Sequence, residues 1–185
     1  MVRRDIFKNN KKFVLEAVSQ DGYALRYASE ELKNDKEVIL KAVSKNGCAL
    51  EYASDELKND KEVVLKAVSQ NGRVIQCASD ELRNDKEVVL KAVSQHGHTL
   101  EHASDELMND KEVVLEAVSR DARAIRHASD ELRNDIEIQM KFKKYFKTPR
   151  ELFKFENLNF KFRSVTITSS RYDNLNEPLK KKIKK

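Results

Sequence analysis

Cysteine is scarce in this chain of 185 residues, which contains only Cys48 and Cys77. The two fall at different positions of the repeat described below, so they do not indicate a disulfide framework. The sequence also contains no signal-peptide pattern and no apolar run near the roughly 20 residues that a transmembrane helix needs. We therefore expect a protein of the reducing cytoplasm, without a transmembrane segment.

Glycine is nearly as rare, with four residues, and none of them belongs to a glycine-rich loop that could hold a phosphate group. No Cys-x-x-Cys pair accompanies the four histidines, so the usual ligand pattern of a structural zinc site is missing. These absences leave no motif for a nucleotide, a metal or another cofactor, and we expect none.

What the sequence does contain is one stretch, residues 35–59, repeated almost letter for letter. A fixed period between about 20 and 50 residues is typical of a solenoid, in which each unit packs only against its neighbours. We predict an all-α fold, a short solenoid of two-helix repeats with a capping helix and a small strand-forming C-terminal extension. The first residue of the stretch recurs every 25 residues, as Asp35, Asp60, Asp85, Asp110 and Asp135.

The same period sets the expected domain boundaries. We place an N-terminal partial unit at 1–9, five tandem repeats at 10–34, 35–59, 60–84, 85–109 and 110–134, the capping helix at 135–147 and a basic extension at 148–185.

The first helix of a unit is predicted over residues 36–45, after Asp35 as the N-cap. Glu37 lies four residues before Lys41, and we expect these two to form an ion pair on the helix surface. Gly47 should end the helix in the left-handed backbone conformation, which glycine adopts at no steric cost.

The second half of the unit, residues 49–57, also has helical spacing of its apolar residues. Ser54 either lies inside one helix or caps a separate short turn, and we favour a helix that breaks at this serine.

Two units depart from the pattern. Ala122 replaces the glycine of the turn in the fifth unit, which should strain or reshape that corner. In the helix that begins the sixth unit, Gln139 and Lys143 replace apolar residues four positions apart. Since these two share one helix face, we predict that this face meets water and that the helix caps the stack.

The C-terminal segment differs in composition from the repeats. Residues 136–185 carry 14 Lys or Arg and 5 Asp or Glu, whereas residues 1–135 carry 22 and 26. Residues 153–167 alternate apolar and polar side chains, which favours strands, and the last residues are expected to be disordered. A basic segment of this kind could bind nucleic acid or an anionic membrane, or it could pack its phenylalanines on the capping helix.

The repeated pattern D-x-E-V-V-L-x-A-V-x-x-N-G-x-A-L-x-Y-A-S-x-E-L-x-N resembles a tandem helical-repeat family described as a domain of unknown function, found in protists, large DNA viruses and amoeba-associated bacteria. The resemblance covers about residues 10–140, with the tail from Phe142 onward outside it. Tyr27 and Tyr52 match the tyrosine of the pattern, while Cys77, His102 and His127 depart from it. The resemblance implies the fold and brings no activity, ligand or catalytic residue.

Differences among the five units concentrate at three positions of the second half. Solenoids commonly use a stacked surface for recognition, although exposed positions can also simply drift. We call these positions the variable face and predict that it binds a partner. Its residues are Tyr23, Cys48, Arg73, His98 and Arg123 at the first position, Arg26, Glu51, Gln76, Glu101 and Arg126 at the second, and Tyr27, Tyr52, Cys77, His102 and His127 at the third.

Two chemical sites can be weighed against this interpretation. His98 and His102 are four residues apart and could share a zinc ion with Cys77 or His127, but neighbouring units of a helical stack lie about 10 Å apart, which is long for a common ion. Ser54 and its copies could suggest a hydrolase, but five equivalent serines favour a structural role. We expect neither a metal site nor catalytic residues.

The sequence therefore predicts a non-enzymatic protein–protein interaction module or scaffold. The main alternative is a nucleic-acid or ribonucleoprotein accessory factor that acts through the basic tail. A third possibility is a module separated from a larger repeat protein, with little function of its own. No residue pattern names the partner, the biological process or the oligomeric state.

Overall fold

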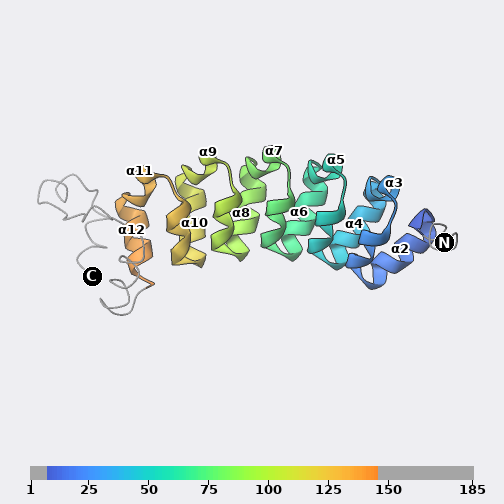
Figure 1. Cartoon of the computed structure of the whole chain (residues 1–185). Coiled ribbons are helices and arrows are strands. Elements are labelled where there is room, and N and C mark those ends of the chain that lie inside the picture. The colour runs from blue at the N-terminus through green and yellow to red at the C-terminus, as the bar shows by residue number, and fades with distance from the viewer. Residues whose placement is uncertain (1–7, 146–185) are drawn as a thin grey trace, which may run out of the picture. The chain divides into compact units, whose positions relative to one another are not determined.

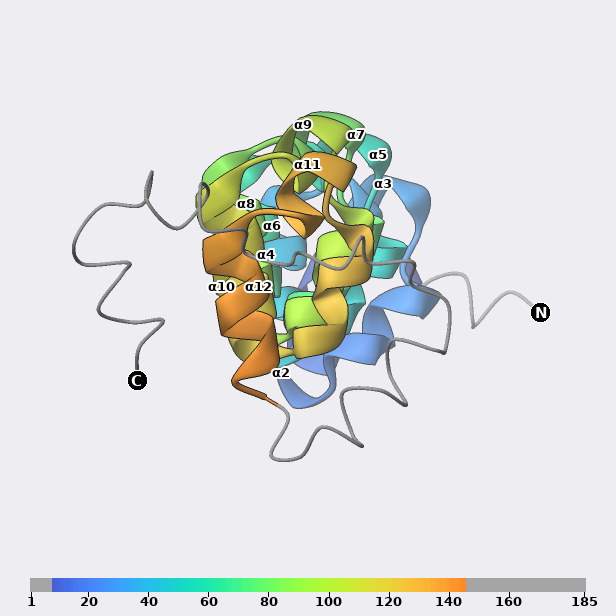
Figure 2. The same cartoon turned by 90° about the vertical axis from the view of Figure 1, so that its left-hand side faces the viewer.

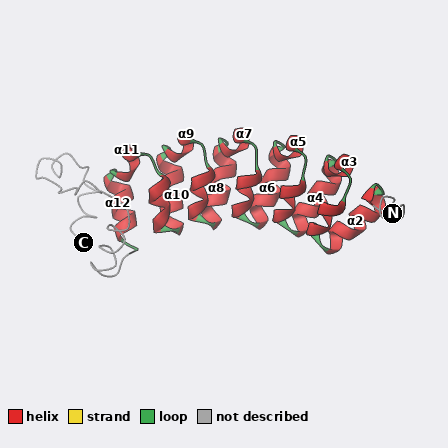
Figure 3. Ribbon diagram, viewed as in Figure 1, coloured by secondary structure: helices red, strands yellow, loops and turns green. Residues whose placement is uncertain are grey.

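The computed structural model describes residues 8–145, and within these residues the regular structure is entirely helical, without a strand (Figure 3). The expected all-α repeat fold is confirmed. The described residues all belong to the first of the two units into which the chain divides, Met1–Lys147 and Thr148–Lys185. The predicted strand-forming extension lies outside the described residues.

Each repeat contains three helical segments rather than the two that we predicted, and Figure 1 shows them following one another along the stack. The long helices are α2 (Lys11–Gln20), α4 (Lys36–Lys45), α6 (Lys61–Gln70), α8 (Lys86–Gln95), α10 (Lys111–Arg120) and the final α12 (Ile136–Lys143). The 3-10 helices are η1 (Gly22–Tyr27), η2 (Gly47–Tyr52), η3 (Gly72–Cys77), η4 (Gly97–His102) and η5 (Ala122–His127). The short helices are α3 (Glu30–Lys33), α5 (Asp55–Lys58), α7 (Asp80–Arg83), α9 (Asp105–Met108) and α11 (Asp130–Arg133).

Local capping explains where these segments begin. The Asp35 carboxylate accepts a hydrogen bond from the amide of Val38 in the first turn of α4. Ser54 lies between η2 and α5, and its hydroxyl accepts from the amide of Leu57. Both bonds satisfy amides that the first turn of a helix leaves free. The expected break at Ser54 is therefore confirmed, with the serine as the cap of a separate short helix.

The corner after the long helix differs from our prediction. None of the four glycines has a φ in the left-handed region. Instead Asn46 is extended, with φ −151° and ψ 112°, and its side chain accepts from the amide of Cys48. Glycine is required here for space, because a Cβ on Gly47 would stand 2.4 Å from the carbonyl oxygen of Ala67 in the next unit.

Ala122 also behaves differently from our expectation. Asp121, which precedes it, has φ −143° and ψ 112°, close to the values at Asn46. The corner is therefore as regular as the others, since no unit requires a left-handed residue there. Ala122 is buried where η5 packs against α12.

Stacking builds one core along the described part of the chain. The long helices contact their neighbours in chain order, as do the 3-10 helices (Figure 1). Seen along the stack, the short helices gather at one edge (Figure 2). In α4 the side chains of Val38, Ile39 and Val43 are 0% exposed, whereas Leu40 remains partly exposed. One unit therefore buries its long helix on two sides and leaves a leucine at the surface.

The final helix, α12, only partly confirms the prediction that one of its faces is exposed to water. Lys143 is exposed, as we expected, but Gln139 is buried at 8% exposure. Its amide donates a hydrogen bond to the backbone carbonyl of Arg133, and this bond satisfies a polar group that the sequence pattern placed in water.

Candidate interaction surfaces

The variable face lies on the five 3-10 helices. All fifteen of its side chains are exposed or partly exposed, and none is buried. Successive 3-10 helices contact one another from η1 to η5, so these side chains form a continuous strip. The apolar residues between them point inward, as for Leu50 and Ile75, which are 0% exposed.

Aromatic residues gather at the N-terminal end of this strip. The rings of Tyr23 and Tyr52 meet edge to face with centroids 6.4 Å apart. The guanidinium of Arg26 lies 4.4 Å from the ring centroid of Tyr27, which is 64% exposed. Exposed tyrosine and arginine of this kind are the side chains that protein interfaces most often bury.

Histidines gather at the C-terminal end. The Glu101 carboxylate lies 3.6 Å from Nε2 of His102 and 3.7 Å from Nε2 of His127. Burial lowers the pKa of His127 despite the opposing effect of Glu101, so this imidazole is mainly neutral at pH 7. Among residues 8–145 no group of three His, Cys, Asp or Glu side chains is arranged to hold a metal ion.

The cysteines and the repeated serines have structural surroundings. Burial raises the pKa of the Cys77 thiol, which keeps it protonated and weakly nucleophilic at neutral pH. The Ser54 hydroxyl donates to the side chain of Asn34 in the preceding unit while it accepts from the amide of Leu57. The hydroxyl therefore acts as a donor that joins two units and as an acceptor that caps the short helix.

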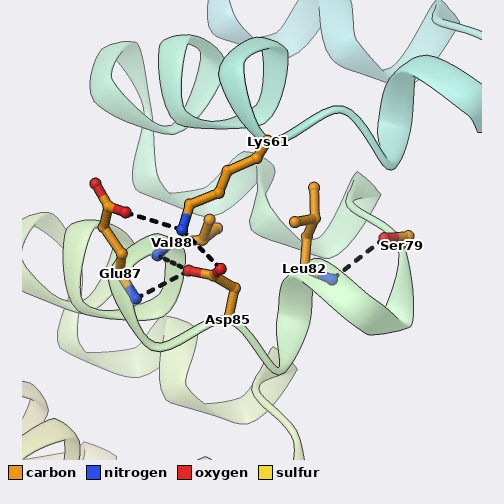
Figure 4. A network of polar contacts seen from close by, with 6 residues as sticks. All are labelled: Lys61, Ser79, Leu82, Asp85, Glu87 and Val88. Carbon is orange, nitrogen blue, oxygen red and sulfur yellow. Dashed lines mark hydrogen bonds and ion pairs between the residues drawn. The ribbon is translucent and has the colours of Figure 1, made fainter.

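An ion-pair ladder joins the long helices. The ammonium of Lys61 lies 2.8 Å from Asp85 and 2.9 Å from Glu87 of the next unit (Figure 4). Equivalent pairs occur at Lys11, Lys36, Lys86 and Lys111. The pairing expected between Glu37 and Lys41 is therefore wrong, because Glu37 instead lies 2.7 Å from Lys11 of the preceding unit.

These contacts shift the pKa values of both partners. Hydrogen bonds to Asp85 and then to Glu87 raise the pKa of Lys61. Burial alone would raise the pKa of Asp85, but the hydrogen bonds from Lys61 and from the amide of Val88 outweigh burial and lower it. Both groups are therefore held charged near neutral pH.

A second surface, which we did not predict, runs along the outer side of the long helices. Four shallow hollows follow one another there, and neighbouring hollows share a leucine and a serine. Leu40 and Ser44 line the first and second hollows, and Leu65 and Ser69 line the second and third. We call this surface the Leu/Ser trough and define it by Leu15, Leu40, Leu65, Leu90 and Leu115 with Ser19, Ser44, Ser69, Ser94 and Ser119.

A signal for the trough was present in the sequence. Its leucine and serine recur in all five units and stand four residues apart, on one helix face. An apolar residue at this position would ordinarily be expected in the core, and only the packing shows that it is partly exposed in every unit.

These features define a class of protein, a stack of tandem helical repeats with two exposed faces. No helix in the described part of the chain is long and apolar enough to cross a membrane. The family model described as Domain of unknown function (DUF4116) matches residues 10–58, 35–83, 60–108 and 110–153, and the chain belongs to this family. The last match extends beyond the limit near residue 140 that we expected. Neither the curated proteins nor the solved structures contain a match.

Proposed function

We propose that this protein is a non-enzymatic interaction module that binds a partner protein through its variable face. The observation that carries the proposal is the distribution of differences among the units. The side chains that differ at these three positions lie exposed or partly exposed on touching 3-10 helices, whereas many constant ones, such as Ala42, Ser54 and Leu57, cap or pack the stack. Stacked surfaces of this kind serve recognition in other repeat proteins.

The aromatic end of the strip is the expected centre of binding. Tyr23, Tyr27 and Tyr52 offer large, rigid side chains beside Arg26, and such residues contribute most of the binding energy in many interfaces. The histidine end would then add polar contacts at the rim of the interface.

The repetition itself supports the absence of catalysis. A nucleophile needs one base and one oxyanion site, whereas Ser54 and its copies form similar bonds in successive units. We also propose a cytoplasmic location, because Cys48 and Cys77 are free thiols in the structure and free thiols persist in reducing compartments.

Capture of partner proteins by the full-length chain tests this function. Replacing two tyrosines of the aromatic end, in a Tyr27→Ala/Tyr52→Ala variant, should reduce capture of a specific partner at least tenfold. A Lys45→Ala/Gln70→Ala variant is the matched control, since both side chains are exposed ends of long helices outside the variable face. Equal capture by all three proteins would contradict a role of the variable face.

The charge of the C-terminal segment favours a second candidate. Residues 136–185 carry 14 basic and 5 acidic side chains, a composition that suits binding to nucleic acid by counterion release. In that case affinity for single-stranded RNA or DNA should fall steeply between about 50 and 200 mM salt. Deletion of residues 148–185 should abolish that binding and leave partner capture by the variable face intact.

A further inference from the structure

The charged residues of the variable face change sign from one unit to the next. The 3-10 helices η1, η2, η3 and η4 carry, in this order, Arg26, Glu51, Arg73 and Glu101, and all four side chains are exposed. Successive 3-10 helices contact one another, so these charges follow along the strip as positive, negative, positive and negative. The last 3-10 helix, η5, continues the row with arginine.

The four charges are not neutralised within the chain. Among residues 8–145 the side chains of Glu51 and Arg73 form no ion pair and no hydrogen bond. Arg26 contacts the uncharged ring of Tyr27, and Glu101 lies beside two histidines rather than a lysine or an arginine. These charges are therefore available to a partner.

The basic residues of the short helices do not cancel Glu51. Lys58 lies 3.7 Å from Asp55 in its own helix, and Arg83 is paired with Asp80 in the same way. The carboxylate of Glu51 therefore keeps its charge although Lys58 is close enough to act on the same Cys77 thiol.

An alternating row of charges is complementary to a reversed copy of itself. We consider two copies that face each other in antiparallel, with a two-fold axis between η2 and η3, so that η1 meets η4 and η2 meets η3. Arg26 then lies opposite Glu101, since both occupy the second position of their units. Glu51 meets η3 at Gln76, one 3-10 turn or about 6 Å from Arg73 and on the same side of that helix. Each contact occurs twice, as in any isologous interface.

The aromatic side chains favour this alignment over others. Tyr27, which is 64% exposed, comes to lie against His102 of the other copy, because both hold the third position. If η1 met η5 instead, Arg26 would face Arg126, and like charges disfavour such a contact. If η2 met η5, opposite charges would meet again, but the tyrosines of η1 would remain in water.

We propose that the variable face binds a second copy of this chain, with η1 and η2 of each copy against η4 and η3 of the other. This inference rests on the function proposed for the variable face and names its partner. The differences among the units then have a physical role, because five identical units would allow the two copies to slide in steps of one unit. A nucleic acid fits the same strip less well, since Glu51 and Glu101 would each stand beside a phosphate.

Sedimentation velocity of the full-length protein tests the proposal. We expect a dimer at about 100 μM chain. Arg26→Glu should weaken dimerisation at least tenfold, because it places two carboxylates at each contact between η1 and η4. Glu101→Arg should do the same with two guanidinium groups. Lys12→Glu is the matched control, an equal change of charge in the first unit on an exposed residue of α2, and should leave the affinity within twofold.

Mixing the two defective variants gives the sharpest result. A copy with Arg26→Glu presents two glutamates and a copy with Glu101→Arg presents two arginines, so an equimolar mixture should dimerise again with at least tenfold higher affinity than either variant alone. Circular dichroism checks that each variant is folded. A chain that stays monomeric, an unaffected dimer in both variants, or a mixture that does not recover would overturn the inference.

The inference and the proposed function fail in different ways. A monomeric protein whose capture of another protein is still reduced by Tyr27→Ala/Tyr52→Ala would overturn the self-association and leave the role of the variable face standing. A dimer that neither Arg26→Glu nor Tyr27→Ala/Tyr52→Ala weakens would remove support from both.

Discussion

The Leu/Ser trough and the variable face both lie at the surface, yet they differ in how much their residues vary among the five units. The trough keeps the same leucine and serine in every unit, whereas the first position of the variable face changes from Tyr23 through Cys48 to Arg73 and His98. A constant surface presents the same contact at each step and suits a ligand that is itself repetitive. A variable surface is different at each step and suits one particular partner.

The two faces also differ in what lies beneath them. The long helix α4 buries Val38, Ile39 and Val43, and among its large apolar side chains only Leu40 is partly exposed, beside polar residues. The 3-10 helix η2 buries Gly47, Ala49 and Leu50, and it leaves the three positions of the variable face exposed or partly exposed. Substitutions should therefore separate the stability of the stack from its binding surfaces.

The largest effect on stability is expected from a buried residue of the 3-10 helices that carry the variable face. Ile75→Ala should lower the free energy of unfolding by about 2–5 kcal/mol, because Ile75 is 0% exposed at the centre of the stack. Leu65→Ala in the trough should cost less, about 1 kcal/mol, since Leu65 is partly exposed and its truncation removes less buried apolar surface. Urea unfolding measures both values. An equal loss of unfolding free energy at the two positions would contradict the distinction between the trough leucines and the buried core.

The next largest effect on stability is expected at the corner between a long helix and the 3-10 helix that follows it. A Cβ on Gly97 would stand 2.2 Å from the carbonyl oxygen of Ala117, so Gly97→Ala should destabilise the protein by about 1–3 kcal/mol. Ala122→Gly is the matched control at the last corner and should cost less than about 1 kcal/mol, mainly through chain entropy. Thermal unfolding of both variants checks the comparison, and a neutral Gly97→Ala variant would show that the neighbouring helix yields easily.

Acid should act on the ladder that flanks the trough. The pKa values of Asp35, Asp60, Asp85 and Asp110 are lowered in the fold, so their contribution to stability is complete above about pH 4 and disappears as the pH falls through the folded-state pKa. We expect the urea midpoint to fall between pH 4 and pH 2.5.

Single substitutions connect this pH dependence to the ladder. Asp85→Ala should cost about 1 kcal/mol at pH 7, because the first turn of α8 loses its cap. Lys61→Met should flatten the acid response of the protein relative to the wild type. An unchanged pH profile in Lys61→Met would assign the acid sensitivity to other carboxylates.

The smallest effect is expected at His96, which replaces the capping Asn or Asp of the other corners. His96 forms no side-chain cap bond, whereas Asn71 at the same position accepts from the amide of Arg73. His96→Asn should therefore stabilise the protein by about 0.5–1 kcal/mol, as seen by a higher unfolding temperature. Asn71→His provides the reverse test and should lose a similar amount.

Much of the local structure follows from short stretches of sequence. Asp35 and Ser54 begin helices because their side chains accept hydrogen bonds from amides three residues away, and the apolar spacing after each one sets the buried face. The period itself required only the comparison of one unit with the next. For these reasons the repeat, the long helices and the break at Ser54 could all be predicted.

Other features depend on contacts with a neighbouring unit. Gly47 is needed because Ala67 of the next unit approaches it, Glu37 pairs with Lys11 of the preceding unit instead of Lys41, and Gln139 donates a hydrogen bond to Arg133 of the preceding unit. The helix caps and the helical spacing within one unit do not determine how the next unit packs against it.

The candidate sites divide in the same way. The sequence by itself determined the repeating unit, its caps and the list of positions that vary, because these depend on contacts within a few residues. Only the tertiary structure decided which of those positions form one surface, and that the leucine row lies in a solvent-facing trough. The physical reason is that exposure and pairing are set by the neighbouring unit, whose approach is a property of the stack.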